Sequence, residues 1–402
     1  MDLPQEKLRR AAFYLTFACA FAPFCSIAAS QILLGASFFV LIVARQRLRL
    51  PPLRLPLALF LLGTLVSLAF SGDPWGGRAQ VRKFFVFLIL VCVATTLRRI
   101  HQVRSLAMWW IAAATLSSLW GLVQFFRKYE AARRAGGDFY RSYIGQRITG
   151  FMGHWMTFSG ELMVALLVLA AFLMFSPERR RRLWWLAGCG AVITVALVLG
   201  LTRGAWLGTA AGAVYLVWCW NRKCLLALPA LVVIGYLAAP GAVRERVISA
   251  FHPHGQVDSN QHRIVTWRTG LEMIKAHPWL GLGPEQVGKQ FNQYIPADIP
   301  RPLPEGWYGH LHNIYLQYAA ERGIPTMLVL LWILGKVLYD FARAARKVPP
   351  GPSDARFILR GCTAAVVGMM VTGLFEHNLG DSEVLQLFLT TIAAGYVAVD
   401  DV

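Results

Sequence analysis

The sequence predicts an all-α polytopic membrane protein that forms a single integral membrane domain over residues 1–402. Hydrophobic residues make up 56% of the chain, and the mean hydropathy is +0.49. These residues fall in blocks of roughly 15 to 22 positions with almost no charge, a length that crosses a bilayer as a helix. Basic residues gather in every second short loop, as expected of a chain that crosses a membrane repeatedly.

We count about twelve such blocks, some of them short enough to be half-spanning or tilted helices. They cover approximately residues 11–27, 30–45, 55–71, 83–97, 105–126, 154–175, 183–200, 205–220, 223–240, 323–343, 357–376 and 382–399. No small-residue cleavage pattern follows the first block, which we interpret as a membrane helix and not a signal peptide. The seven cysteines lie in or beside apolar blocks, which predicts neither a disulfide nor a zinc site.

The formal net charge of +19 does not require a nucleic-acid partner, because basic cytoplasmic loops and anionic membrane lipids account for it. The alternation of basic loops places both termini in the cytoplasm. It places two polar regions outside, a basic loop at 127–153 and a long helical loop at 241–322 between the ninth and tenth helices. The basic loop is either a contact for anionic lipid headgroups or a solvated surface.

The 241–322 region contains a helix pattern that begins at Asn260 and stops before Pro278. Its apolar positions recur at helical spacing: Ile264, Trp267, Leu271 and Ile274. Such a helix can lie along the membrane–water interface with its apolar face toward lipid. The region is therefore expected to carry part of a functional site.

Arg203 stands in the turn "LTRGAW" between two apolar blocks, and no other Lys or Arg lies between Arg182 and Arg222. An arginine at a membrane edge is costly unless it has an anionic partner or reaches water. Gly200 and Gly204 bracket the turn and permit close backbone approach to a ligand. Arg203 is a candidate anion-binding residue, and an interfacial arginine that reaches water is the alternative.

Arg263 lies in the first turn of the 260–277 helix, where a cation is unfavourable but a bound anion is favourable. A role in holding a phosphate would explain it. Arg268, about one turn further along, is the alternative, and both could also be ordinary surface arginines.

His312 precedes a polar stripe, Asn313, Gln317 and Glu321, at the start of the next apolar block. A histidine is the natural general base near neutral pH, although an isolated histidine is often structural. Glu321 lies too far along the helix axis to orient the His312 ring, so we expect it to pair with Arg322 or another helix.

Further polar residues face the same side of the membrane in this topology. They are Arg147, His154 and Glu161 in "QRITGFMGHWMTFSGE", Glu376, His377, Asn378 and Asp381 in "FEHNLGDSE", and Tyr308 and His310 before His312. The histidines His252, His254 and His262 lack a carboxylate or cysteine at ligand spacing. The sequence therefore predicts no metal site, and the lack of a Walker loop predicts no ATP site.

Several arginines and a histidine at a lipid boundary suit an amphiphile that carries a pyrophosphate, because guanidinium groups match phosphate oxygens. A polyprenyl-pyrophosphate-linked sugar fits this description, and its pyrophosphate is a good leaving group. A transporter of such a glycan is an alternative, but it would show inverted repeats and mid-membrane charges. The sequence shows neither beyond Glu161.

Three segments carry a family resemblance: "TRGAW", then "HRIVTWRTGLEMIKAHPWLGLGPEQ", then "HNIYLQYAAERG". In this order, and over roughly residues 140–380, the chain resembles the O-antigen ligase/polymerase superfamily, and most closely O-antigen ligase. The resemblance implies a glycosyltransferase that moves O-antigen from undecaprenyl pyrophosphate to a lipid A–core sugar hydroxyl on the periplasmic face of the inner membrane. The lack of an acidic pair of the kind that holds Mg²⁺ predicts a metal-independent reaction without a cofactor, and a single displacement would make it inverting.

The same resemblance implies roles for individual residues. Arg203 and Arg263 would bind the pyrophosphate, and His312 would activate the acceptor hydroxyl. The other candidate substrate-binding residues are Arg147, His154, Asn313, Gln317, Tyr308, Asp381 and Arg268. The alternative within the superfamily is an O-antigen polymerase, which uses the same donor but a second lipid-linked glycan as acceptor.

Overall fold

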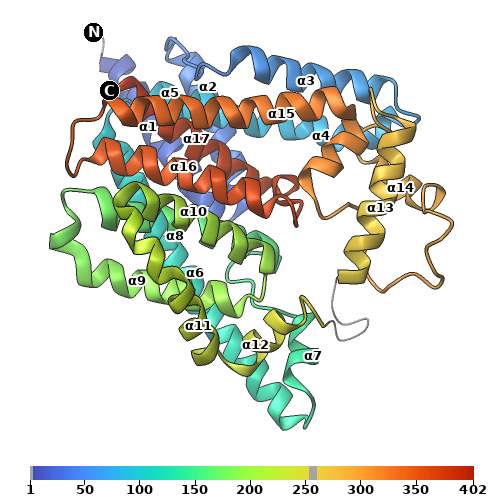
Figure 1. The fold of residues 1–402 in the computed structure, drawn as a ribbon. Coiled ribbons are helices and arrows are strands. Elements are labelled where there is room, and N and C mark those ends of the chain that lie inside the picture. The colour runs from blue at the N-terminus through green and yellow to red at the C-terminus, as the bar shows by residue number, and fades with distance from the viewer. Residues whose placement is uncertain (1–2, 253–259) are drawn as a thin grey trace.

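The computed structural model describes residues 3–252 and 260–402, and these residues form helices joined by links, of which the segment 294–313 before α15 is a long one (Figure 1). The described part of the chain contains no β-strand. The predicted all-α class is therefore confirmed. The helices are α1 (Leu3–Phe21), α2 (Ile27–Val43), α3 (Arg54–Ala69), α4 (Pro74–Arg82), α5 (Leu88–Thr96), α6 (Ile100–Arg134), α7 (Phe139–Ile144), α8 (Trp155–Phe175), α9 (Arg179–Leu199), α10 (Arg203–Asn221), α11 (Leu228–Ala238), α12 (Gly241–Ile248), α13 (Asn260–Ala276), α14 (Gln286–Gln290), α15 (Ile314–Lys347), α16 (Asp354–Thr372) and α17 (Ser382–Asp400).

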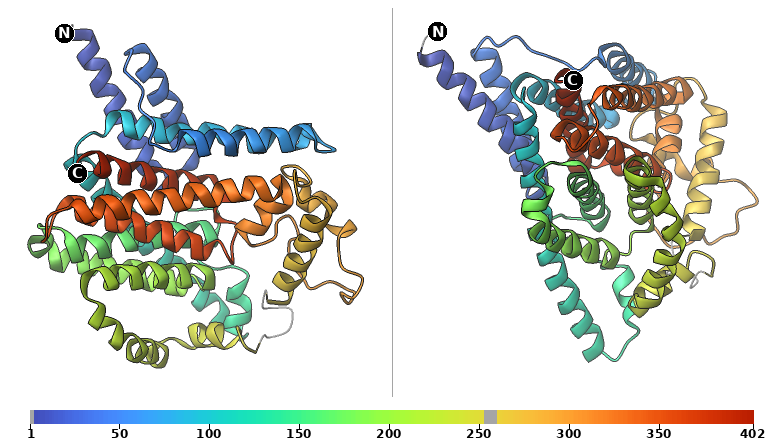
Figure 2. Two further views of the ribbon diagram at one scale, coloured as in Figure 1. Left: turned by 45° about the horizontal axis from the view of Figure 1, so that its top comes forward. Right: turned by 60° about the vertical axis from the view of Figure 1, so that its left-hand side comes forward.

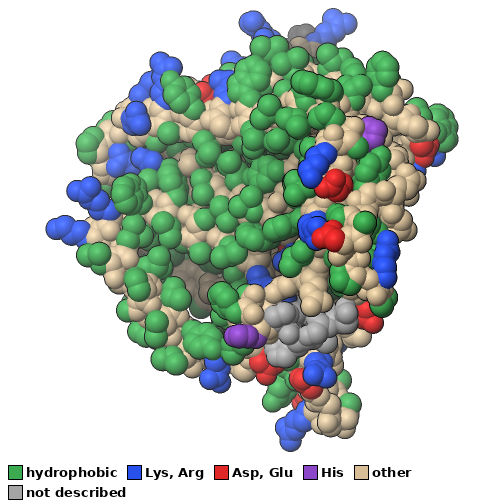
Figure 3. Space-filling view, turned by 45° about the vertical axis from the view of Figure 1, so that its right-hand side comes forward, with side chains coloured by type: hydrophobic (Ala, Val, Ile, Leu, Met, Phe, Trp, Pro, Cys, Tyr) green, Lys and Arg blue, Asp and Glu red, His purple; other side chains and the backbone are tan. Residues whose placement is uncertain are grey.

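Eight helical stretches in the described residues are long and apolar enough to cross a membrane, which indicates a multi-pass membrane protein. They are Pro74–Thr96, Ile100–Arg134, Trp155–Phe175, Arg182–Leu199, Arg203–Ala238, Ile314–Lys347, Asp354–Thr372 and Ser382–Asp400. Hydrophobic side chains cover much of the surface in Figure 3, as expected of a face turned toward lipid.

The expected number of about twelve spans stays a prediction, because length and composition support eight. Two of the expected blocks, 205–220 and 223–240, fall in the single apolar stretch Arg203–Ala238, where a 3₁₀ segment joins α10 to α11. Two other blocks form α2 and α3, which are apolar but shorter than the eight stretches.

The centre of the bundle is built around α16, which packs against α8, α10 and α17. α8 and α17 are buried over most of their surface, consistent with their being apolar on all sides. The long helices run side by side, and α13 crosses their ends on one side of the molecule (Figures 1 and 2). This arrangement brings the starts of α8, α10, α15 and α17 to the same end as α13.

A stripe of glycines allows α10 to approach α16 closely. Gly204, Gly208 and Gly212 recur every fourth residue, so they lie on one face of the helix. A β-carbon on Gly208 would lie 2.5 Å from the Gly368 carbonyl oxygen and 2.0 Å from Thr372 Oγ1. Small residues at this spacing permit close helix packing in membrane proteins, and here they hold the start of α10 against the end of α16.

The helix α15 is broken near its start at Gly323, which has φ +78° and ψ 163°. The sequence suggested a short polar helix and a separate span at 323–343, whereas the structure has one element with this break. Pro325 has no N–H to donate to the carbonyl of Glu321. That carbonyl accepts instead from the Gly283 N–H at 2.9 Å and from Ser67 Oγ at 2.7 Å. The Glu321 carbonyl therefore keeps hydrogen-bond partners at the break.

The predicted helix between Asn260 and Pro278 is confirmed as α13. Its buried face differs from the apolar stripe seen in the sequence. His262, Thr266, Thr269 and Met273 are among the buried residues, whereas Ile264 and Leu271 are exposed. The helix therefore turns polar residues toward the protein and leaves part of its apolar stripe on the outside.

Gly208→Ala is expected to destabilise the protein, because the new methyl group meets the backbone of α16 and overpacking typically costs about 1–3 kcal/mol. The measurement is the thermal unfolding temperature in detergent. Gly335→Ala on α15 is the matched control, because a β-carbon there meets open space and alanine favours helix over glycine. An unchanged unfolding temperature for Gly208→Ala would contradict the close packing of α10 on α16.

Candidate active site

A cavity of about 670 Å³ opens at the end of the bundle where α13 crosses the long helices. Its walls come from α4, the link before α8, the start of α10, α12, α13, the segment before α15 and the link between α16 and α17. Arg203, Arg263 and His312, which lie far apart in the sequence, all line it. The structure therefore brings the three predicted catalytic residues to one cavity.

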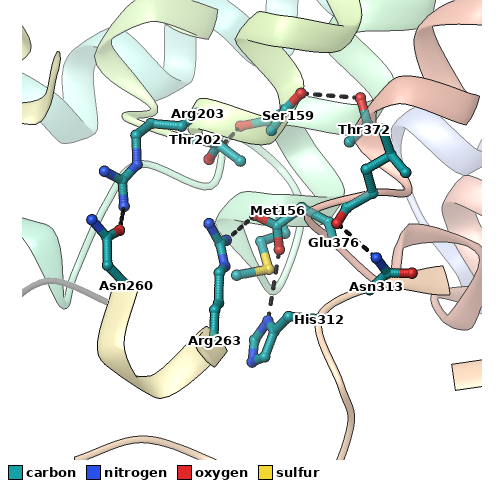
Figure 4. Close-up of polar contacts among 12 residues, drawn as sticks. Met156, Ser159, Thr202, Arg203, Asn260, Arg263, His312, Asn313, Thr372 and Glu376 are labelled. Carbon is teal, nitrogen blue, oxygen red and sulfur yellow. Dashed lines mark hydrogen bonds and ion pairs between the residues drawn. The ribbon is translucent and has the colours of Figure 1, made fainter. Parts of the chain in front are cut away.

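A buried carboxylate, Glu376, lies between Arg263 and His312 (Figure 4). Arg263 Nη2 is 2.6 Å from Glu376 Oε1, and His312 Nδ1 is 3.8 Å from Glu376 Oε2. The first contact is a charge-assisted hydrogen bond, whereas the second is longer than a hydrogen bond and acts through charge. Glu376 thus links an arginine of α13 to a histidine that precedes α15.

The ionised form of Glu376 is stabilised by its neighbours. Its side chain is almost fully buried, and burial by itself raises the pKa of a carboxyl. The charges of Arg263, His312 and Arg147 outweigh burial and lower the pKa of Glu376 to about 2. Glu376 is therefore an anion at neutral pH and balances part of the positive charge around it.

Arg203 begins α10 directly after a tight turn. Leu201 in this turn has φ +48°, a left-handed conformation that is uncommon for a residue with a side chain. Tyr143 Oη donates to the Leu199 carbonyl at 2.7 Å and holds the turn from the α7 side. The Arg203 guanidinium hydrogen-bonds to Asn260 Oδ1 at the start of α13 (Figure 4), so the two predicted pyrophosphate-binding segments contact each other.

Two further arginines support the same turn. Arg147 Nη1 donates to the Leu201 carbonyl at 3.2 Å, and Arg246 Nε donates to it at 3.1 Å. Both side chains are buried. Burial, together with the charge of Arg246, lowers the pKa of Arg147 to about 9, which still leaves it charged at neutral pH. Two like charges in a buried position favour an anion between them.

Three other histidines surround His312. The ring centroids of His310 and His262 lie 4.1 Å and 5.2 Å from the His312 ring, and His377 lies 5.6 Å from His310. His312 itself has φ +50°, and backbone strain of this kind is concentrated at functional sites. The segment before α15 thus has a left-handed backbone conformation at His312, within a cluster of imidazole rings.

The three neighbouring histidines are poor proton acceptors. Burial, then the charge of His312, lowers the pKa of His310 to about 3 and that of His262 to about 4. Burial, then the charge of His310, lowers the pKa of His377 well below its usual value. These three rings are neutral at physiological pH. They therefore do not repel a positive charge on the His312 ring.

Four more of the predicted substrate-binding residues line the cavity: Arg147, His154, Gln317 and Asp381. Gln317 Oε1 accepts from the Leu311 N–H at 2.8 Å, and Asp381 Oδ2 accepts from Thr157 Oγ1 at 2.8 Å. Burial raises the pKa of Asp381. His154 lies directly before α8, where its Nδ1 accepts from the Met156 N–H at 3.2 Å.

The remaining three candidates lie elsewhere. Asn313 caps α15, because its Oδ1 accepts from the backbone N–H groups of Tyr315 and Leu316 at 2.9 and 3.0 Å. The Tyr308 ring packs against the His262 ring, with 4.5 Å between the ring centroids. Arg268 forms an exposed ion pair with Asp298 at 2.8 Å. These three residues do not line the cavity. A direct contact between them and the substrate stays a prediction.

Glu376 and Arg246 are two charged cavity residues that the sequence analysis did not assign to the site. Glu376 belongs to the noted segment "FEHNLGDSE", but its pairing with Arg263 depends on a separation of more than a hundred residues. Arg246 stands in the polar segment "VRERV", where nothing in the spacing distinguishes it from Arg244. Burial separates the two, because Arg246 is buried and Arg244 is exposed.

Glu321 pairs as the sequence suggested. Its Oε2 lies 3.0 Å from Arg322 Nη1, and its Oε1 accepts from Gln317 Nε2 at 2.9 Å. Arg322 also donates to Gln80 of α4 at 3.1 Å. The pair therefore anchors the start of α15 to α4.

No group of three potential metal ligands is found within residues 3–252 and 260–402. Of the three histidines weighed as ligands, His254 lies outside the described residues. His262 faces the cavity, and His252 lies on the surface.

These features define a class of protein: a multi-pass membrane protein with a deep cavity that gathers arginines, a buried glutamate and a histidine. Residues 189–331 match the family model for O-antigen ligase. This match supports the resemblance to the O-antigen ligase/polymerase superfamily, whose members are enzymes that act on lipid-linked glycans. The segment contains Arg203, Arg263 and His312 and ends before Glu376. No curated protein matches the chain.

Stability should fall as the pH is lowered from 7.5 to 5. The pKa values of His262 and His310 are lower in the folded protein than the ordinary 6.5. Below pH 6.5 the unfolded chain therefore binds protons that the folded protein does not, so the stability present above pH 6.5 is progressively lost toward pH 4. The measurement is the unfolding temperature at the two pH values.

His310→Gln should reduce this difference in unfolding temperature, because it removes one of the partly buried, neutral rings. His101→Gln, a change at an exposed histidine of α6, is the control and should leave the difference as in the wild type. If His310→Gln retained the full difference, the His310 ring would not be the source of the pH dependence.

Proposed function

We propose that the protein is an O-antigen ligase. The donor is a glycan on undecaprenyl pyrophosphate, and the acceptor is a sugar hydroxyl of lipid A–core. The observation that carries the proposal is the shared carboxylate of Glu376, which holds Arg263 and His312 at one cavity that Arg203 also lines. A pyrophosphate-binding cation and a candidate base thus lie on either side of one anion.

The pyrophosphate of the donor would be bound by guanidinium groups. Arg203 and Arg263 are the principal candidates. The buried Arg147 and Arg246 line the same cavity and both donate to the Leu201 carbonyl. Arginine forks match pairs of phosphate oxygens and keep their charge at neutral pH. As the donor bond breaks, negative charge grows on the departing pyrophosphate, and preorganised cations stabilise that charge.

His312 would act as the general base. Its imidazole takes the proton of the acceptor hydroxyl, the acceptor oxygen forms a bond to the anomeric carbon, and the bond from that carbon to the pyrophosphate breaks. Undecaprenyl pyrophosphate leaves with the electron pair. A single displacement of this kind inverts the anomeric centre. The negative charge of Glu376 stabilises the protonated His312 ring that forms in this step.

Glu376 would also affect how the donor binds, through its contact with Arg263. Without a donor, Glu376 is the partner of Arg263 at 2.6 Å. A bound pyrophosphate competes for the same guanidinium, which has enough donors to serve both anions. Glu376 therefore fixes the direction of Arg263 before the donor arrives, and this preorganisation lowers the cost of binding.

The proposed setting is the bacterial inner membrane, with both termini in the cytoplasm and the cavity open to the periplasm. The two termini lie at the same end of the bundle, away from the cavity (Figures 1 and 2). The regions 127–153 and 241–322 are then periplasmic. Arg134 and Arg141 of the first region are exposed, each with a nearby acid, and we propose that this basic region contacts the phosphorylated core of the acceptor.

The reaction is tested by incubating the purified protein with a synthetic polyprenyl-pyrophosphate-linked sugar and lipid A–core, in the presence of EDTA. Sugar on lipid A–core supports a ligase. Lengthened lipid-linked chains would instead identify a polymerase, and donor that crosses a vesicle membrane unchanged would identify a transporter. Loss of transfer on addition of EDTA would contradict the metal-independent mechanism.

His312→Ala and Arg203→Ala are each expected to reduce transfer strongly. General-base help is typically worth about 10²–10⁴-fold, and one preorganised charge partner about 10²–10³-fold. His101→Ala and Arg244→Ala are matched controls at exposed positions and should leave the rate unchanged. Near-wild-type transfer by folded His312→Ala protein would rule out the base assignment.

Glu376→Gln should lower kcat by roughly 10²-fold, because the neutral amide no longer stabilises the protonated His312 ring. The KM for the donor should stay near the wild-type value, because the amide oxygen of Gln can still accept from Arg263 and hold its direction. Glu272→Gln, an exposed change on α13, is the control. A higher donor KM with unchanged kcat would show that Glu376 acts on donor binding and not on the base.

A further inference from the structure

A second polar cavity, of about 460 Å³, is built from the middle of α1, the link that follows α2, and the end of α5 with the link after it. Its lining includes Arg9, Arg45, Arg47 and Arg98. No carboxylate is among the described residues that line it. The proposed ligase reaction uses none of these arginines.

This cavity lies at the opposite end of the bundle from the candidate active site. Asp381, which lines the active-site cavity, directly precedes α17. The other end of α17 carries Asp400, which lines a small neighbouring cavity together with Arg98. Nineteen helical residues span roughly 28 Å, about the thickness of the hydrocarbon core of a membrane. The two cavities are therefore at opposite membrane surfaces.

The arginines of this cavity come from separate parts of the chain, so local sequence alone does not gather them. Arg98 is held in place because its Nε donates to the Thr95 carbonyl at 2.9 Å. Burial, then the charges of Arg49 and Arg9, lower the pKa of Arg98. Arg45 has φ +46°, a conformation that costs free energy for a residue with a side chain. Like charges gathered in one hollow favour a bound anion.

The surface next to the cavity is apolar. Ile42 and Val43 end α2 two residues before Arg45, and both are exposed. Tyr14 on α1 is exposed as well, about one turn beyond Arg9. Phe13 forms part of the cavity wall itself. A ligand that fills the hollow with an anion can therefore lay hydrocarbon chains along α1 and α2.

We propose that this cavity binds the phosphate headgroup of an anionic phospholipid in the leaflet opposite to the candidate active site. The four arginines contact the phosphate, and the acyl chains lie on the exposed faces of α1 and α2. A free phosphate ion would use the same arginines but would gain nothing from the apolar border. The inference depends on insertion in a membrane and not on the proposed transfer reaction.

The test is binding of phosphatidylglycerol to the full-length protein in mild detergent, measured by native mass spectrometry or by titration, with phosphatidylcholine as the neutral lipid. The test variant is Arg9→Gln/Arg45→Gln/Arg47→Gln. A direct charge contact at a surface is worth up to about fivefold, so the loss of three arginine–phosphate contacts should weaken phosphatidylglycerol binding by about 100-fold. Binding of phosphatidylcholine should not change.

The matched control is Arg343→Gln/Arg346→Gln/Lys347→Gln. It removes the same charge from exposed positions at the end of α15, which lies at the same membrane surface. Phosphatidylglycerol binding should stay within about threefold of wild type in this variant, because charges outside the cavity act on the bound headgroup only through screened, longer-range attraction. Equal losses in the two triple variants would overturn the proposal, because general surface charge would then explain the binding.

Two further results decide between a lipid site and a phosphate site. Inorganic phosphate at millimolar concentration should not displace phosphatidylglycerol from the wild type; displacement would overturn the lipid assignment. The test variant should unfold at the wild-type temperature and keep its transfer activity with detergent-solubilised substrates, since its changes lie at exposed positions. Weakened lipid binding in such a folded variant supports the site whether or not the transfer reaction proves to be correct.

Discussion

The candidate site depends on one buried charge. Glu376 carries a carboxylate that is almost fully removed from water, and an unpaired ion in that position would be very costly. Arg263 supplies the compensating contact at 2.6 Å, and His312 adds a second positive charge when it is protonated. Those two residues come from α13 and from the segment before α15, which also share an apolar cluster that includes Met273 and Leu311. The carboxylate adds a charged link between these two parts of the chain.

The rest of the fold brings Glu376 to the right place. The glycine stripe of α10 lets that helix lie against α16, and a β-carbon on Gly204 would lie 3.0 Å from Glu376 Cγ. The turn before α10 therefore sits beside the end of α16. The break at Gly323 lets the segment 278–283 hydrogen-bond to the start of α15, which positions the residues just before it. Close backbone contact, and not side-chain charge, sets the overall geometry.

Helix type was predictable because it follows from local rules. Apolar blocks with little charge marked the long helices, and the start and stop signals at Asn260 and Pro278 marked α13 correctly. The number of spans was less predictable, since the short apolar helices α2 and α3 fall below the length that composition alone can assign. The buried face of α13 was also missed, because the His262 side of the helix is covered by neighbours that lie far away in the sequence.

The sequence by itself determined the helical, membrane-embedded character of the chain and pointed to Arg203, Arg263 and His312, because hydropathy and the isolation of a charged residue are local properties. Only the tertiary structure decided that these three share a cavity, that Glu376 and Arg246 join them, and that Arg268 does not. Burial and pairing depend on which helix ends meet. That meeting is set by backbone approach between distant segments, which spacing along one chain does not encode.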